Sequence, residues 1–300
     1  MPIKRLCLIL ISILVLYTLE PYSANGIPIN SDLGLTPHKG EFIFRAQGRY
    51  LRKSDDPLNL GRSVDAVVVP FVGVYGFTSK SSILVKVPTI YRELKTASGT
   101  FRSDHGPGDV IILGKHRFFT HNFKGGTSRI SAIAGLELPT GDDNARDSLG
   151  LLPKGIQLGS GSVDVIAGGT YTLQTLNYEI DADLRYIFNQ EANDFEFGDI
   201  FKYNFAYQKR IWPSILPDKG IYSQWNAVLE LNGMLERKSE SRGSEVASSG
   251  GNTIFLSPGI QFVSKRSVYE FSFLYPVVQN LNGSQLETDY SLALSYRYIF

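Results

Sequence analysis

Charged side chains occupy every second position from 179 to 185, within the segment 178–188. The residues between them are apolar or aromatic, and the charges are Glu179, Asp181, Asp183 and Arg185. Successive side chains of a β-strand point to opposite faces, so these four charges are predicted to share one face. A row of fixed charges can select solutes by field and size at the constriction of a pore. The alternative is that the charges pair with others across a narrow lumen and simply fill it.

The same alternation predicts charged side chains on the inner face of other segments. The residues predicted to line a lumen are Arg45, Arg49, Lys86, Arg117, Glu179, Asp181, Asp183, Arg185, Lys202, Glu230 and Arg297. Lys115, Arg129, Asp109, Glu137, Asp164 and Glu270 fall on this face by the same alternation. Cations and anions nearly balance, which favours pairing of most of these charges and argues against a strongly ion-selective pore.

Apolar residues also fall where lumen residues are expected, in the segments 64–77 and 82–92. Val68, Val72 and Val74 are predicted to form an apolar lumen wall. Such a wall, or a lateral exit beside it, would suit hydrophobic solutes. Two alternatives stay open: a plug covers the patch, or the face assignment is off by one residue, which would turn every side chain to the other face.

The sequence contains no arrangement typical of a catalytic or metal site. A nucleophilic site needs a histidine oriented by a third polar group, but His38, His105, His116 and His121 are scattered over different predicted elements. No cluster of His, Cys and carboxylates has the spacing of metal ligands. We therefore predict no catalytic, cofactor-binding or metal-binding residue, no cofactor, and no enzymatic activity.

The final segment, Tyr290–Phe300, predicts the kind of strand that must carry these residues. Large apolar side chains occupy every second position, small or charged ones lie between them, and the sequence stops on Phe300. A strand with lipid on one side and water on the other has this pattern, with aromatic residues at the membrane interface. The segment resembles the C-terminal sorting signal of bacterial outer-membrane barrels, which implies the barrel-assembly machinery as a partner.

Reading for alternation predicts about twelve strands connected by alternately short and long links. Tight turns on one side and long loops on the other are typical of outer-membrane barrels. The predicted strands are Glu41–Leu51, Val64–Phe77, Ser82–Arg92, Asp109–Phe119, Arg129–Leu138, Ser162–Leu173, Tyr178–Phe188, Phe201–Tyr207, Asn226–Asn232, Ile254–Val263, Val268–Tyr275 and Tyr290–Phe300. The fold class is all-β, a transmembrane up-and-down antiparallel barrel over residues 41–300.

The N-terminal region predicts export. Lys4 and Arg5 precede an apolar run, 6–19, which is too short to span a bilayer as a helix and has the form of a secretory signal. We predict a signal peptide at 1–26, with an uncleaved anchor as the alternative. Residues 27–40 are an irregular lead-in that either hangs in the periplasm or enters the lumen as a plug. The formal net charge of +1 suggests no nucleic-acid partner.

Six motifs resemble an outer-membrane family named for the MetA-pathway of phenol degradation. They are Gly106–Asp109 (GPGD), Leu138–Asp142 (LPTGD), Leu158–Asp164 (LGSGSVD), Glu230–Gly233 (ELNG), Leu256–Gln261 (LSPGIQ) and Tyr296–Phe300 (YRYIF). Each motif is short, and the order and spacing of all six over residues 41–300 carry the resemblance. It implies an outer-membrane barrel that passes small hydrophobic or aromatic compounds, and it assigns no catalytic residue.

We therefore expect a monomeric channel in the outer membrane, in contact with membrane lipid and passively passing small, hydrophobic or aromatic solutes. Two other classes stay open: a structural or adhesive barrel that transports nothing, and an outer-membrane barrel hydrolase. Solute flux would separate the first class from a channel, and a lipid-hydrolysis assay would test the second.

Overall fold

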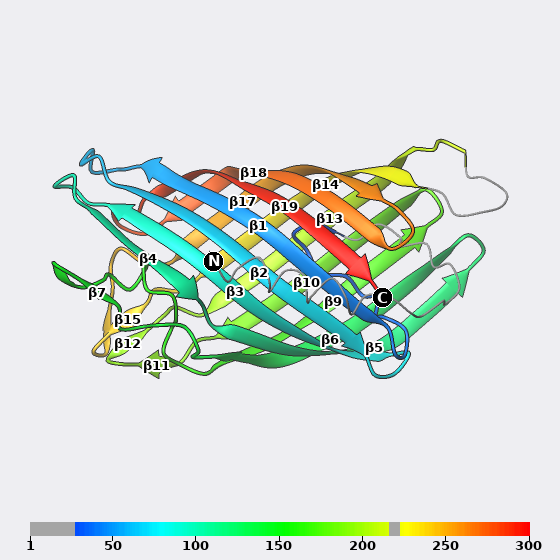
Figure 1. Cartoon of the computed structure of the whole chain (residues 1–300), viewed down its shortest axis with the longest axis horizontal. Coiled ribbons are helices and arrows are strands. Elements are labelled where there is room, and N and C mark those ends of the chain that lie inside the picture. The colour runs from blue at the N-terminus through cyan, green and yellow to red at the C-terminus, as the bar shows by residue number, and fades with distance from the viewer. Residues whose placement is uncertain (1–27, 216–222) are drawn as a thin grey trace, which may run out of the picture.

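The computed structural model describes residues 28–215 and 223–300, and its core is a closed antiparallel barrel (Figure 1). The predicted signal peptide lies outside the described residues. The twelve barrel strands are β1 (Phe42–Asp55), β2 (Ser63–Gly76), β3 (Ser81–Lys95), β5 (Val110–Phe123), β6 (Gly126–Leu138), β9 (Asp164–Thr175), β10 (Tyr178–Phe188), β13 (Ile200–Trp212), β14 (Gln224–Glu236), β17 (Gly251–Val263), β18 (Ser267–Leu281) and β19 (Glu287–Ile299). Each strand pairs with its sequence neighbours, and β1 pairs with β19 to close the barrel. The predicted up-and-down barrel is confirmed.

The two ends of the barrel differ in the length of their connections. At the turn end, links such as 77–80, 124–125 and 176–177 are tight. At the loop end, links such as 139–163 and 237–250 are long. Figure 1 shows the loop end on the left and the turn end on the right. Among the described residues, the predicted alternation of short and long links is confirmed except at the link before β19.

Three details of the predicted elements were wrong. The link after β3 contains a further strand, β4 (Phe101–Pro107), which pairs with the second half of β3 and leaves only Ser81–Lys86 to pair with β5. The predicted long link before β19 is short, because β18 continues past Tyr275 to Leu281. Two-residue strands also form in the long loops. A strand this short is too brief to show an alternating pattern in the sequence. These strands are β7 (Arg146–Asp147), β8 (Gly150–Leu151), β11 (Glu191–Ala192), β12 (Phe195–Glu196), β15 (Glu240–Ser241) and β16 (Ser244–Glu245).

The barrel is apolar outside and polar inside, the reverse of a water-soluble protein. Outward side chains such as Leu184, Phe271 and Leu294 are exposed, whereas inward ones such as Asp181, Glu230 and Gln261 are buried. Exposed apolar surface on this scale is stable only against lipid. Among the described residues, no helix is long and apolar enough to cross a bilayer.

Aromatic rings form a belt around the outside of the barrel near the turn end. Trp225 lies 4.9 Å from Phe262, and Tyr269 lies 5.1 Å from Tyr296, in both cases between ring centroids. The Phe262 and Tyr269 rings link the two pairs at 6.3 Å. Amphipathic rings of this kind prefer the level of the lipid headgroups. The belt therefore sets the depth at which the turn end meets the membrane surface.

Replacing Leu294 with arginine is expected to destabilise the barrel by about 2–4 kcal/mol, because a charge near the middle of the lipid-facing surface loses its hydration. Leu294 lies near the middle of β19 and is 67% exposed. Leu235→Arg is the matched control, because Leu235 faces outward at the loop end of β14, where the cost falls to about 0–1 kcal/mol. Urea unfolding in lipid vesicles measures both values. Equal costs at the two positions would contradict this orientation of the barrel in the bilayer.

Candidate functional site: the barrel lumen

The candidate site is the lumen, and all the predicted lumen-lining residues lie on the inner face. Cross-strand partners share a face, and Arg45 pairs with Val72, which pairs with Lys86. Lys202 pairs with Arg185 on the neighbouring strand β10. The other charged residues of the predicted set also point into the lumen. In each case the side chain itself, or its cross-strand partner, contacts another group inside the barrel. These residues are Arg49, Arg117, Glu179, Asp181, Asp183, Glu230 and Arg297.

Glu270 is the centre of an ion cluster inside the lumen. Its two carboxylate oxygens accept from the guanidinium groups of Arg45 at 3.0 Å and Arg297 at 3.1 Å. Ser295 and Gln261 donate further hydrogen bonds to the same carboxylate, and its side chain has no exposed surface. The cluster joins β1, β17, β18 and β19 near the turn end. Here the predicted pairing of charges across strands is what the structure shows.

The lead-in enters the lumen instead of hanging outside it. We call residues 28–40 the lumen segment. The Glu230 carboxylate accepts hydrogen bonds from the backbone N–H of Ile29 at 2.8 Å and of Asn30 at 2.9 Å. On β1, Arg45 donates to the Ile29 carbonyl at 2.5 Å and Arg49 to the Asn30 side chain at 2.8 Å. These contacts hold the start of the segment between β1 and β14.

Asp32 and Gly34 fix the lumen segment to the other side of the barrel. The Asp32 carboxylate pairs with Lys115 at 2.5 Å and with Arg185 at 3.1 Å. The Gly34 N–H donates to Thr172 at 2.8 Å, and Ser131 donates to the Gly34 carbonyl at 2.7 Å. A Cβ atom at position 34 would lie 2.8 Å from a backbone oxygen of β6, so this close approach requires glycine. The lumen segment therefore crosses the barrel from wall to wall.

A continuous apolar strip lines another part of the inner wall. The structure places Val68, Val72 and Val74 on the inner face of β2, because their partners on β1 or β3 point inward. The strip continues along β3 through Leu84, Pro88 and Ile90, in the segment 82–92 where apolar lumen residues were predicted. It then extends round the barrel through side chains that the prediction did not include: Ile111, Leu113, Ile133, Ile166, Ile187 and Ile200. Alternation along the strands would have been enough to predict that these side chains point inward. Each lies two residues along its strand from another inward side chain, or is the cross-strand partner of one. A lateral exit beside this strip stays a prediction.

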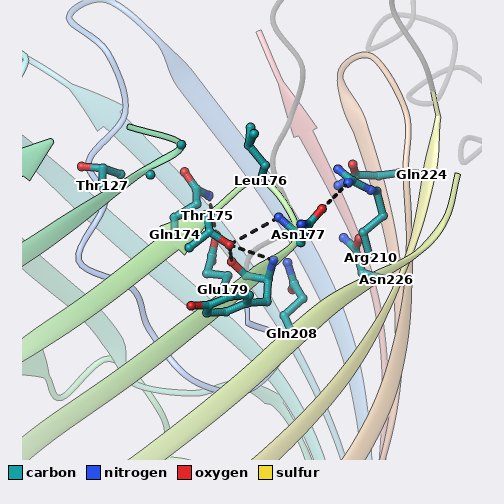
Figure 2. A pocket seen from close by; sticks show the side chains of 13 residues that line it. Thr127, Gln174, Thr175, Leu176, Asn177, Glu179, Gln208, Arg210, Gln224 and Asn226 are labelled. Atoms are coloured by element: carbon teal, nitrogen blue, oxygen red, sulfur yellow. Dashed lines mark hydrogen bonds between the residues drawn. The ribbon is translucent and has the colours of Figure 1, made fainter. Parts of the chain in front are cut away.

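A polar pocket opens at the turn end, with a volume of about 400 Å³ (Figure 2). Glu179, Gln208 and Asn226 line its floor, and Arg210 donates to Asn177 at its rim. Gln174 donates to the Glu179 carboxylate, but no cation among the described residues forms an ion pair with Glu179. The pairing expected for most of the lumen charges therefore does not extend to Glu179 in this pocket.

No group of three or more His, Cys, Asp or Glu in the described part of the chain is arranged to hold a metal ion. His116 lies on the outer face of β5, where its Nδ1 is 2.8 Å from the Ser81 hydroxyl. The lumen presents one apolar wall, one polar wall, and the lumen segment between them.

Replacing Glu270 with alanine is expected to destabilise the barrel by about 3 kcal/mol, because two buried guanidinium groups lose their partner. The matched control is Glu245→Ala in a loop, since the pair that Glu245 forms with Lys238 at 2.9 Å is largely exposed and contributes little. The measurement is the midpoint of the heat-induced mobility shift in gels. Equal midpoints for both variants and the unchanged protein would show that the Glu270 cluster does not support the barrel.

Comparison with known proteins gives one family. The family model described as "Putative MetA-pathway of phenol degradation" matches residues 51–272. No curated protein matches the chain.

Three solved barrels illustrate the structural similarity. The COG4313 outer membrane channel from Pseudomonas putida F1 has 13% identity and a TM-score of 0.70, covering 91% of this chain and 100% of that one. The β domain of the Bordetella autotransporter BrkA has 11% identity and a TM-score of 0.47, covering 87% and 100%. The CymD monoaromatic hydrocarbon channel has 10% identity and a TM-score of 0.42, covering 88% and 89%. The first of these shows that the fold is that of an outer-membrane barrel.

Proposed function

Because the chain belongs to the family described as "Putative MetA-pathway of phenol degradation", we propose that it is an outer-membrane channel. Its solutes are small hydrophobic or aromatic compounds, which pass without an energy source. In this proposal the barrel works as a monomer, is inserted by the barrel-assembly machinery through β19, and catalyses no reaction.

The apolar strip is the observation that supports this solute class. Inward-pointing valine, leucine and isoleucine do not favour the passage of water-soluble molecules, because they make it less favourable for water to fill the pore. An apolar solute that leaves water gains about 25 cal/mol for each Å² of apolar surface it covers. Val68, Val72 and Leu84 offer such surface inside the barrel.

The lumen segment determines the width of the path. It crosses the barrel between β1, β14 and β6, held by hydrogen bonds and ion pairs rather than by covalent links. Solutes in this proposal pass between the lumen segment and the apolar strip, on the side where apolar side chains predominate. Large hydrophilic solutes are excluded.

The test uses a neutral aromatic dye, N-phenyl-1-naphthylamine, which fluoresces once it reaches phospholipid. Cells of a Gram-negative host that produce the protein should take up this dye faster than cells that produce a barrel of similar size from another family. Arabinose entry into vesicles containing the pure protein should stay near the level of empty vesicles. Equal dye uptake by both kinds of cell would refute the channel and favour a closed, structural barrel. Phospholipid cleavage by the pure protein would favour a hydrolase.

A further inference from the structure

Lys86 is a charged residue inside the apolar strip. It follows Leu84 and precedes Pro88 on the inner face of β3. Its partners on the adjacent strands are Val72 of β2 and Ile111 of β5, so apolar side chains surround it on the wall. Among the described residues, its ammonium group has no hydrogen bond and no ion pair. An ammonium group in such surroundings is unfavourable unless something pairs with it.

A second lysine faces the same lumen from another part of the wall, since Lys202 is the cross-strand partner of the inward-pointing Arg185. Lys202 of β13 repels Lys86 electrostatically, and Arg49 and Arg185 repel both lysines. The one carboxylate that attracts both is Glu137. Lys202 also makes no hydrogen bond or ion pair in the described part of the chain, whereas Arg185 pairs with Asp32 and Asp183. Neither ammonium group in this part of the lumen is thus held by a counter-ion among the described residues.

The apolar strip and the two lysines together indicate which kind of ligand would bind here. We infer that the lumen binds an apolar molecule bearing one anionic group, with the anion at Lys86 and Lys202 and the apolar body along Val72, Leu84 and Ile111. A small hydrated anion would contact only the ammonium groups. The apolar wall around Lys86 cannot replace the hydrogen bonds to water that the anion loses on binding. A neutral apolar molecule would leave both ammonium groups unpaired. The inference deepens the proposed function and depends on it.

Two dyes with the same ring system separate the charge from the apolar body. 8-Anilinonaphthalene-1-sulfonate carries a sulfonate, and N-phenyl-1-naphthylamine is the same scaffold without it. Both are titrated against the full-length protein in lipid nanodiscs, and the signal of empty nanodiscs is subtracted. The variants are Lys86→Met and Lys202→Met, which retain length and remove charge. Lys238→Met in the loop is the control, because Lys238 lies outside the lumen and pairs with Glu245.

The sulfonate dye should bind the unchanged protein, and Lys86→Met or Lys202→Met should weaken it about tenfold each, as expected for a lost hydrogen bond to a charged group. The neutral dye should bind these variants as well as the unchanged protein or better. Lys238→Met should alter neither. Added salt should weaken only the sulfonate dye. The heat-induced mobility shift of each variant shows that the barrel still folds.

The inference is overturned if the sulfonate dye binds Lys86→Met as tightly as the unchanged protein, or if both dyes weaken equally. If the neutral dye enters producing cells but neither lysine affects the sulfonate dye, only this inference fails. If neither dye binds nor enters, the channel itself fails.

Discussion

Aspartate at both Val68 and Val72 is expected to reduce uptake of a neutral aromatic dye at least about tenfold. The two side chains lie on the inner face of β2, opposite Arg49 and Arg45 on β1. A benzene-sized solute covers on the order of 60 Å² of such a wall, a contact of about 1.5 kcal/mol, which is about tenfold in rate when it is lost. Hydrated carboxylates at both positions remove that contact and narrow the path. The measurement is the initial rate of N-phenyl-1-naphthylamine uptake by producing cells.

Threonine at the same two positions is the matched control, because it nearly retains the volume of valine and adds no charge. It should cause a smaller loss than aspartate. Arabinose entry into vesicles reports whether the barrel remains intact, and it should be the same for both double variants. Unchanged dye uptake by the aspartate variant would remove the apolar strip from the path of the solute.

Replacing Glu230 with alanine is expected to release the start of the lumen segment and raise the ion conductance of the barrel. Glu230 is buried and accepts hydrogen bonds from the backbone N–H groups of Ile29 and Asn30. Each hydrogen bond to a charged group contributes about 1.5–3 kcal/mol, so the population of barrels with a displaced segment should rise about tenfold or more. Single-channel recordings in a planar bilayer measure the conductance and the time spent in the wider state.

Glu236→Ala is the control for this experiment. Glu236 also lies on the inner face of β14, but among the described residues it makes no hydrogen bond or ion pair with the lumen segment. It should leave the conductance near that of the unchanged protein, and Glu230→Gln, which retains one acceptor oxygen, should give an intermediate result. A conductance unaffected by Glu230→Ala would mean that Asp32 and Gly34 suffice to hold the segment, and that its start does not limit the path.

These two predictions concern the two sides of one path. The aspartate pair alters the wall along which an apolar solute moves, whereas Glu230→Ala alters the segment that stands opposite that wall. If the solute passes between them, Glu230→Ala should raise dye uptake and arabinose entry together. The aspartate pair should lower dye uptake alone. The two experiments thus examine the same lumen from opposite sides.

The strand pattern was readable in the sequence because it is local. Side chains alternate along β10 and β19 whatever lies around them, so Glu179 and Arg297 could be assigned to the inner face, and Leu184 and Leu294 to the outer one. Lipid outside and water inside make that alternation strict, which is why all twelve barrel strands were predicted, most of them close to their observed bounds. The end of β18 was missed because Pro276 interrupts the pattern.

Only the tertiary structure shows which groups contact one another inside the lumen. The bond from Ile29 to Glu230 joins residues 201 positions apart, and no local pattern announces such a contact. The same is true of β4, which forms because β3 is long enough to pair with two partners. Alternation placed Lys86 in the lumen, but only the pairing of β2, β3 and β5 surrounds it with apolar side chains. The alternation of residues therefore determined the wall, and contacts between distant residues determined the contents of the lumen.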